Sequence, residues 1–152
     1  MVRMQEIVDA INALMVKKFP KAAAYINTCP KDFRRPSYLI QNPHVYREDA
    51  SRRTVYIEAD FMITYFAEVD SRYIMNIEKL RQAQAGILEL FSCGYITVGD
   101  RRLKVAGSEG ETSLTDTTVD LKVSYFDDRE EAAEPPPAAE KVYTTILLEW
   151  GK

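Results

Sequence analysis

The chain has 152 residues, of which 46% are hydrophobic and 28% are charged, and its formal net charge is −3. This composition is typical of a globular protein, and the length suits one domain with a proper core. The slight negative charge, without a basic patch, argues against sequence-specific nucleic-acid binding. No apolar run is long enough to span a membrane, and the N-terminus lacks the apolar centre of a signal peptide. We therefore expect no membrane partner and no export by the general pathway.

The N-terminal part predicts a helix, a short strand and a loop. Apolar residues recur at three- and four-residue steps from Met4 to Met15, which is the pattern of an amphipathic helix. Phe19-Pro20 is expected to end this helix, because the residue before a proline is pushed away from helical geometry. Residues 23–27 are a short strand candidate, and a polar, basic loop follows at 29–36.

Two strands at 37–46 and 52–66 are expected to form a long hairpin around a polar turn at 48–51. Pro43 cannot donate a hydrogen bond to a ladder, so the first strand should be an edge strand or carry a bulge. The second strand alternates clearly between apolar and polar residues. At about 3.3 Å per residue it would be about 50 Å long, against about 20 Å for a typical strand. Part of the hairpin should therefore project past the sheet.

The second half predicts one more helix and several strands. The helix should run from Asp70 or Ser71 to about Phe91, with Ile77 and Leu80 on its buried face. Gly99-Asp100 is a two-residue hairpin signal. The further strand candidates are 95–98, 101–106, a continuation at 111–114, and 117–126. Together the elements predict an α+β fold, a mostly antiparallel sheet with two main helices packed on one face.

An acidic, proline-rich linker at 128–141 separates the expected domain, residues 1–127, from a strand-like C-terminal arm at 142–152. A lone strand is not stable in water, so the arm should add to a sheet edge of its own subunit or of another. The linker could span roughly 40 Å if extended, which is enough to reach a neighbour. The apolar residues that share one face of the arm are Ile146, Leu148 and Trp150.

The sequence predicts no catalytic, cofactor or metal site. His44 is the only histidine and lies beside Pro43 without a nearby nucleophile, so a surface or interface role is favoured. Glu58 and Asp60 share one strand face, where a solvated pair is more common than an acid–base pair. Cys29 and Cys93 have no metal-type spacing, and two small buried thiols are favoured over a disulfide between them.

The order of these segments resembles a known family. An amphipathic helix ends in Phe19-Pro20, a short strand with Tyr25 follows, and then comes the segment Phe33–Ile40, which reads FRRPSYLI. A long strand closes at Tyr65-Phe66, a helix follows, and a terminal hairpin holds the segment LKVSY at residues 121–125. This order is similar to the tail terminator, or tail completion, proteins of phages and prophages of Gram-positive-type hosts.

The resemblance implies a non-enzymatic virion protein without a cofactor. Such proteins form rings, usually hexamers, that cap the tail tube and join it to the head-proximal side of the particle. The implied partners are other copies of the chain, tail tube and sheath proteins and head–tail adaptor proteins, while DNA passes through the lumen. The protein would be located in the virion tail after assembly in the host cytoplasm. The candidate contact residues are Phe33, Arg34 and Arg35 in the basic loop, Tyr46, Arg52 and Arg53 at the hairpin tip, and Ile146, Leu148 and Trp150 in the arm.

Two alternatives remain open at this point. A small ligand- or peptide-binding α+β module with a regulatory role would need a concave apolar pocket with a few converging polar groups. An enzyme is the third choice, since it would need Glu58 and Asp60 together in a cleft.

Overall fold

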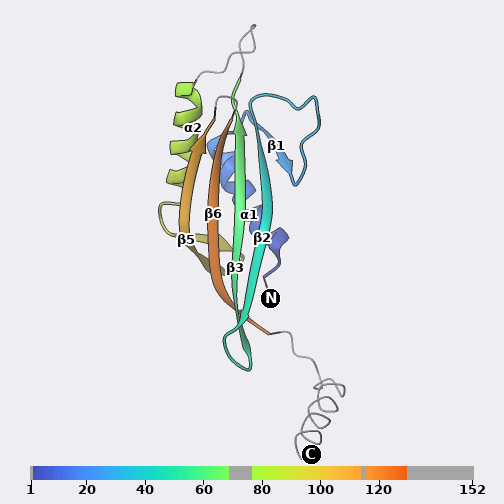
Figure 1. Cartoon of the computed structure of the whole chain (residues 1–152), viewed down its shortest axis with the longest axis vertical. Coiled ribbons are helices and arrows are strands. Elements are labelled where there is room, and N and C mark those ends of the chain that lie inside the picture. Colours follow the sequence, from blue (N-terminus) through green and yellow to red (C-terminus); the bar gives the residue numbers. More distant parts are fainter. Residues whose placement is uncertain (1, 69–76, 114–115, 130–152) are drawn as a thin grey trace, which may run out of the picture.

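The computed structural model describes residues 2–68, 77–113 and 116–129, and it has an α+β fold as the sequence predicts (Figure 1). Two helices, α1 (Met4–Lys18) and α2 (Ile77–Leu90), accompany a six-stranded sheet in this part of the chain. The strands are β1 (Ala23–Ile26), β2 (Ser37–Asp49), β3 (Thr54–Phe66), β4 (Tyr95–Val98), β5 (Arg101–Thr112) and β6 (Thr117–Asp128).

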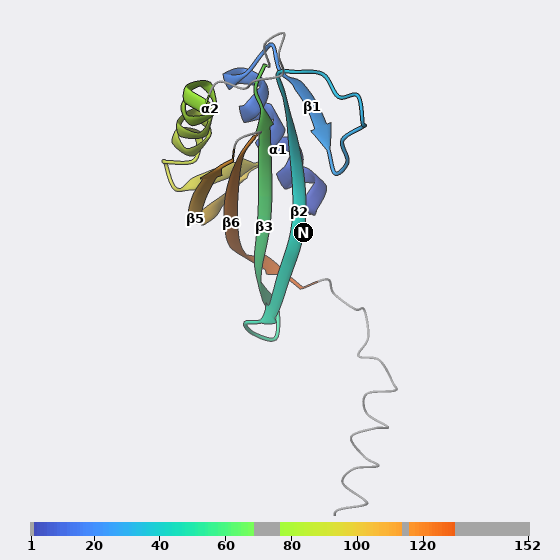
Figure 2. The same ribbon diagram turned by 45° about the horizontal axis from the view of Figure 1, so that its top comes forward.

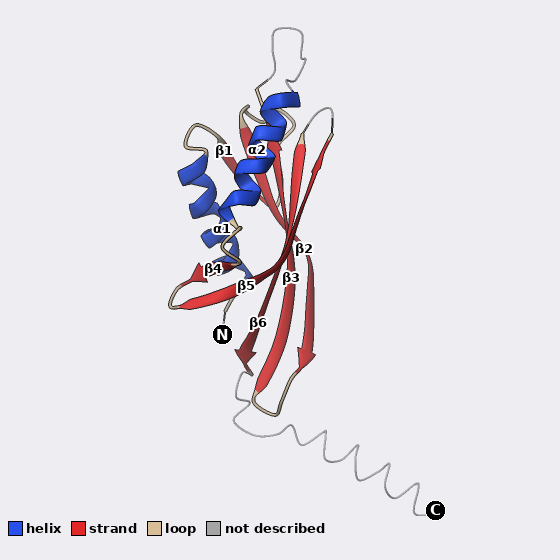
Figure 3. Ribbon diagram, turned by 90° about the vertical axis from the view of Figure 1, so that its left-hand side faces the viewer, coloured by secondary structure: helices blue, strands red, loops and turns tan. Residues whose placement is uncertain are grey.

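The strands follow the order β1-β2-β3-β6-β5-β4 across the sheet. All neighbouring pairs are antiparallel except β1 and β2, which run parallel. The exception arises because residues 27–36 carry the chain back to the end of the sheet where β1 began. Figure 3 shows that the sheet curls, so that β4 lies beside α1. The fold is therefore a curled, mixed sheet, and not a purely antiparallel one.

The hydrophobic core lies between the two helices and one side of the sheet. Alternate residues of β3 and β6 are buried, which is the period of a half-buried strand. In Figures 2 and 3 both helices lie on the same side of β3 and β6. The buried residues from the helices include Ile7, Val8, Ile11, Met15, Leu80 and Ile87. The apolar stripe of the first helix is thus confirmed.

The expected burial of Ile77 is wrong, because this side chain is 40% exposed. Ile77 is the first residue of α2, and the buried face of the helix begins one turn later at Leu80. The predicted beginning of this helix, at Asp70 or Ser71, lies outside the described residues.

The hairpin of β2 and β3 is longer than its sequence signals indicate. Pairing continues to Asp49 and Val55, so the turn falls at residues 50–53 and not at 48–51. The predicted bulge is confirmed, since the register shifts between Gln41 and His44. There the side-chain amide of Asn42 donates to the carbonyl oxygen of Asp60 at 2.8 Å. Beyond the bulge β2 is exposed, and the hairpin extends past the body of the protein (Figures 1 and 2).

The predicted break after residue 106 is wrong, because β5 runs unbroken from Arg101 to Thr112 through both glycines. Residues 101–104 of β5 pair with β4, and residues 104–112 pair with β6, with a bulge in the register between Val105 and Gly107. Gly110 faces α2 at close range. A Cβ atom at this position would lie 2.5 Å from Nε2 and 2.9 Å from Cγ of Gln84. The glycine is needed here for packing.

Replacing Gly110 by alanine is therefore expected to lower the free energy of unfolding by about 1–3 kcal/mol, the usual cost of overpacking. Gly107→Ala is the matched control in the same strand, since a Cβ there meets no atom within 4 Å. This control should be neutral or slightly stabilising. Urea unfolding of both variants measures the difference, and equal stabilities would contradict the packing role of Gly110.

Candidate assembly surface

The hairpin end of the molecule forms a three-stranded extension, which we call the projecting sheet. It consists of residues 44–49 of β2, 54–60 of β3 and 122–128 of β6, joined in continuous register. Each row across the strands presents side chains on one face. Glu48, Tyr56 and Phe126 form one such row on the face turned away from the core, and Tyr46 lies in the next row opposite Glu58.

Three aromatic side chains on that face, Tyr46, Tyr56 and Phe126, form what we call the aromatic patch. The rings of Tyr56 and Phe126 pack with centroids 5.2 Å apart. Phe126 is nevertheless 58% exposed and Tyr46 is 44% exposed. Exposed aromatic residues are enriched where proteins contact one another. The aromatic patch is therefore suited to a protein partner.

Carboxylates accompany the aromatic patch. The hydroxyl of Tyr56 donates to Glu58 at 2.7 Å, and that of Tyr46 donates to Glu48 at 3.2 Å. The hydrogen bond to Glu58 raises the pKa of Tyr56, and burial adds to this effect. The hydrogen bond to Glu48 and its negative charge raise the pKa of Tyr46. Both phenols are thus held as neutral donors, and the patch combines apolar area with fixed polar groups.

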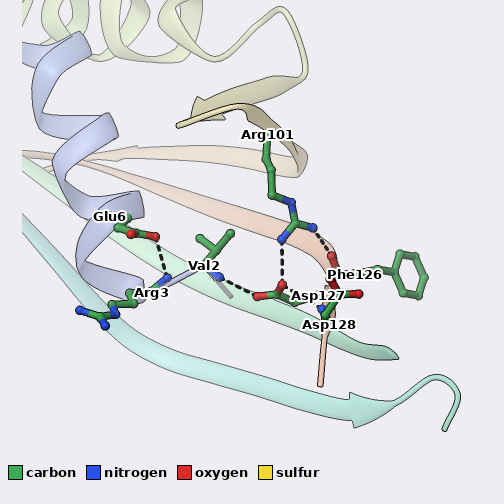
Figure 4. Close-up of polar contacts among 7 residues, drawn as sticks. All are labelled: Val2, Arg3, Glu6, Arg101, Phe126, Asp127 and Asp128. Carbon is green, nitrogen blue, oxygen red and sulfur yellow. Dashed lines mark hydrogen bonds and ion pairs between the residues drawn. The ribbon is translucent and has the colours of Figure 1, made fainter. Parts of the chain in front are cut away.

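Asp127 joins three distant segments at the point where β6 ends (Figure 4). Its side chain is only 2% exposed. It accepts hydrogen bonds from the backbone N–H of Val2 at 2.7 Å and from Nη1 of Arg101 at 2.8 Å. A third comes from the N–H of Asp128 at 2.9 Å, and the other guanidinium nitrogen of Arg101 donates to the carbonyl of Phe126. Burial alone would raise the pKa of Asp127, but these donors outweigh it and lower the pKa below its ordinary value.

Arg129 fastens the next part of the chain to the hairpin tip. Its backbone N–H donates to the carbonyl oxygen of Arg53 at 2.9 Å. Its guanidinium lies 2.7 Å from a carboxylate oxygen of Asp49 and 3.3 Å from the carbonyl of Ser51. We call residues 127–129 the tail root. The tail root is thus bound to the tip of the hairpin, to the N-terminus and to the start of β5.

The predicted contact residues divide between two ends of the hairpin. Tyr46 belongs to the aromatic patch, and Arg52 and Arg53 are exposed at the tip. The basic loop lies at the other end, beside residues 66 and 67, where β2 begins and β3 ends. Nothing in the described contacts joins these two groups. Their role in a contact between proteins stays a prediction.

Two of the three basic-loop residues pack within the molecule. The ring of Phe33 lies 4.6 Å from that of Phe66, and the guanidinium of Arg35 lies 4.8 Å from the Phe33 ring. Arg35 also donates to the carbonyl of Ala67 at 3.2 Å. These contacts hold the loop against the end of β3. Arg34 is exposed, so of the three predicted residues it is the one most available to a partner.

Ile146, Leu148 and Trp150, with nearly all of the linker, lie outside the described residues. Sequence reasoning missed Phe126, Asp127, Arg101 and Arg129. A signal for two of them was present: the alternation of β6 places Phe126 on the polar face and Asp127 on the apolar face. An aromatic residue on a polar face and a carboxylate on an apolar face both invite a functional or structural explanation.

The described residues bring no metal-binding cluster together. They contain no set of three or more His, Cys, Asp or Glu side chains that could hold a metal ion. His44 is exposed, with Nδ1 3.5 Å from a carboxylate oxygen of Asp60. The expectation of two buried thiols is wrong, since Cys93 is exposed in the turn after α2 and Cys29 is partly exposed. Among the same residues, no helix is long and apolar enough to cross a membrane.

One cavity matches the kind of site that the ligand-binding alternative requires. Its volume is about 390 Å³, and it lies between the end of α1, the start of β2, the end of β3 and α2. Its apolar lining includes Phe19, Tyr65 and Ala83, and its polar lining includes Lys18, Lys79 and Gln82.

Comparison with protein families identifies the chain. The family described as phage tail terminator protein matches residues 6–136, which is most of the sequence. The match covers every described element, apart from the first two residues of α1. Comparison with curated proteins finds no match. The chain belongs to the phage tail terminator protein family, a family of structural components of the virion tail.

Proposed function

We propose that this chain caps the phage tail tube as a homo-oligomeric ring, a hexamer, and joins the tube to the head-proximal side of the particle. The family match over residues 6–136 carries this proposal. The partners would be other copies of the chain, the tail tube and sheath proteins on one side, and head–tail adaptor proteins on the other. Assembly would take place in the cytoplasm of the host, a Gram-positive-type bacterium.

A ring requires each copy to present two different surfaces, because its contacts are head-to-tail and close by rotation. The projecting sheet supplies one candidate surface, with exposed aromatic side chains and a long open strand. The C-terminal arm is the second candidate surface, and the linker that leads to it leaves from the tail root. A contact in which the arm of one copy meets the projecting sheet of the next would use two different surfaces of each copy.

The face of the sheet turned away from the core, toward the end opposite the hairpin tip, carries charges that support the passage of DNA through the ring. Four carboxylates gather there on β3, β6 and β5, those of Asp60, Asp120, Glu109 and Glu111, and Lys122 lies opposite Asp60 in the same row. Burial, and then the charges of Glu109, Glu111 and Asp60, raise the pKa of Asp120. A surface of this sign repels the phosphate backbone. We propose that this face lines the lumen, where DNA must move without binding.

The ligand-binding alternative has less support. Its favourable observation is the cavity beside Phe19 and Tyr65. A family of structural tail proteins gives no reason for a ligand there.

Loss of the gene tests the proposed function. A cap stops the addition of tube subunits, so phage that lack this protein should produce tails of excessive and variable length that are not joined to heads. Electron microscopy of lysates measures both properties. Expression of the wild-type chain should restore normal particles. Cys93→Ser is the control variant, because this exposed residue lies outside the projecting sheet and should restore them equally well. Tails of normal length joined to heads without the protein would refute the proposal.

A further inference from the structure

The outer side of β2 is an unoccupied position in the sheet. β1 pairs with β2 only from Ser37 to Ile40, and the N–H of Asn27 closes that pairing on the carbonyl of Ile40 at 3.0 Å. From Gln41 to Asp49, no strand in the described part of the chain lies on that side of β2. The backbone groups of this stretch that point away from β3 are therefore open to another strand, except at Pro43, which has no N–H to donate. We call residues 41–49 the open edge.

The open edge also exposes apolar side chains. Val45 pairs with Ala59, which in turn pairs with Val123, and both of these partners are fully buried. Val45 thus belongs to a row on the core side of the sheet, yet it is 45% exposed. A strand placed beside β2 would cover Val45 and extend this row by one residue. The row is incomplete without such a strand.

Other open edges in the described residues suit an added strand less well. β1 and β4 have only four residues each, and the last residues of β6 are partly covered by Arg101, which bonds the carbonyl of Phe126. The part of β5 after its bulge offers mainly glycine and acidic residues, with no large exposed apolar side chain. The open edge of β2 is the long one that carries apolar area.

We propose that the open edge of β2 receives the arm of a second copy, residues 142–150, as an added β-strand. The inference deepens the proposed function and rests on its self-association. Residues 142–150 of the arm are long enough to pair with the regular part of the open edge, His44 to Asp49, which lies beyond the bulge. Ile146, Leu148 and Trp150 would lie on the same face as Val45 and cover it. Main-chain hydrogen bonds supply affinity in such a contact, and the alternate side chains supply specificity.

A second copy, and not the same chain, is the expected donor because of what the linker contains. The linker starts at the tail root, where Arg129 lies 2.7 Å from Asp49 at one end of the open edge. Three consecutive prolines at 135–137 stiffen the linker in an extended form, which favours a path away from its own body. An extended linker can deliver the arm to the neighbouring copy in a ring.

Trp150 provides a direct test, because it is the only tryptophan of the chain. The full-length protein is diluted from about 100 µM to about 10 nM, and tryptophan emission and acrylamide quenching are followed, with light scattering in parallel. We expect Trp150 to be shielded when the protein is associated and to become exposed on dilution. Val45→Lys places a charge on the open edge and should raise the concentration needed for shielding at least about tenfold.

Val16→Lys is the matched control, since Val16 is 48% exposed and lies on α1, away from the open edge. It should behave as the wild type does. Val45→Thr is a second variant, which keeps the β-branched shape if lysine disturbs folding, and it should weaken shielding by less. Shielding at all dilutions would overturn the role of a second copy. Exposure of Trp150 at every concentration would overturn the assignment to β2. Shielding of Trp150 in both Val45 variants to the same extent as in the wild type would overturn it too.

The same measurements separate this inference from the proposed ring. Association by light scattering with unchanged shielding in Val45→Lys would leave self-association intact and reject only the open edge. Absence of association at every concentration would reject self-association of the free protein and, with it, this inference.

Discussion

Deletion of Lys141–Lys152 is expected to abolish assembly while the domain stays folded. The three apolar side chains on one face of the arm, Ile146, Leu148 and Trp150, would bury area worth on the order of 5 kcal/mol in the contact. Their loss corresponds to about 10³- to 10⁴-fold in the association constant. The core of the described residues is built from segments between Val2 and Asp127, so we expect the domain to fold without the arm.

Sedimentation velocity of the free protein, and co-pelleting with purified tail tubes, measure this loss. Circular dichroism and the midpoint of thermal unfolding should match those of the full chain. Two double variants refine the result, because they separate the faces of the arm. Ile146→Ser with Leu148→Ser should reproduce the deletion, whereas Thr145→Ala with Glu149→Ala should assemble normally. Assembly of the truncated protein to the same extent as the full chain would contradict a role for the arm in assembly.

The second large effect is expected at Asp127. Asp127→Ala leaves the guanidinium of Arg101 and the N–H of Val2 without their carboxylate partner. Breaking a buried pair costs about 3–5 kcal/mol, and the lower end applies here because Arg101 is partly exposed and can turn to water. With a total stability of about 5–15 kcal/mol, the melting temperature should fall by about 10 °C. Thermal unfolding measures this change.

Arg129→Ala is the control in the same tail root. Its ion pair with Asp49 is exposed on both sides, so its removal should change the free energy of unfolding by less than about 1 kcal/mol. Equal losses of unfolding free energy in Asp127→Ala and Arg129→Ala would contradict the larger effect that burial predicts for Asp127.

The pH dependence gives a separate check on Asp127. Its pKa in the folded state lies below its ordinary value of about 3.9. A carboxyl group of this kind stabilises the fold above its unfolded pKa, and this contribution is lost as the pH falls through the folded pKa. The difference in unfolding free energy between wild type and Asp127→Asn should therefore be full at pH 7 and shrink below about pH 4. The same difference at pH 7 and at pH 3 would contradict this account.

Local signals predicted the elements that depend on local chain geometry. The stripe from Met4 to Met15 specifies α1, Pro43 specifies the bulge of β2, and Gly99-Asp100 specifies the turn between β4 and β5. In each case the cause lies within a few residues of the effect. The α+β class followed from the order of these elements, and the family match confirms the resemblance to tail terminators.

Features that depend on distant residues could not be predicted in this way. β5 continues past its glycines because it pairs with β6 as far as Thr112, and nothing near Gly110 in the sequence indicates that partner or the close approach of Gln84. The parallel pairing of β1 with β2 depends on the path of a ten-residue loop, residues 27–36. Asp127 reads as part of an acidic, solvated tail until its partner Val2, 125 residues earlier, is seen beside it.

The bond between Val2 and Asp127 has a practical consequence for recombinant work. Any affinity tag or fluorescent protein fused in front of Val2 would begin beside the corner from which the final segment departs. Such a fusion would crowd the tail root, and we expect it to weaken the proposed contact between copies even though the domain folds. A label on the exposed thiol of Cys93, in the turn behind α2, avoids that corner and leaves the native amino end unaltered.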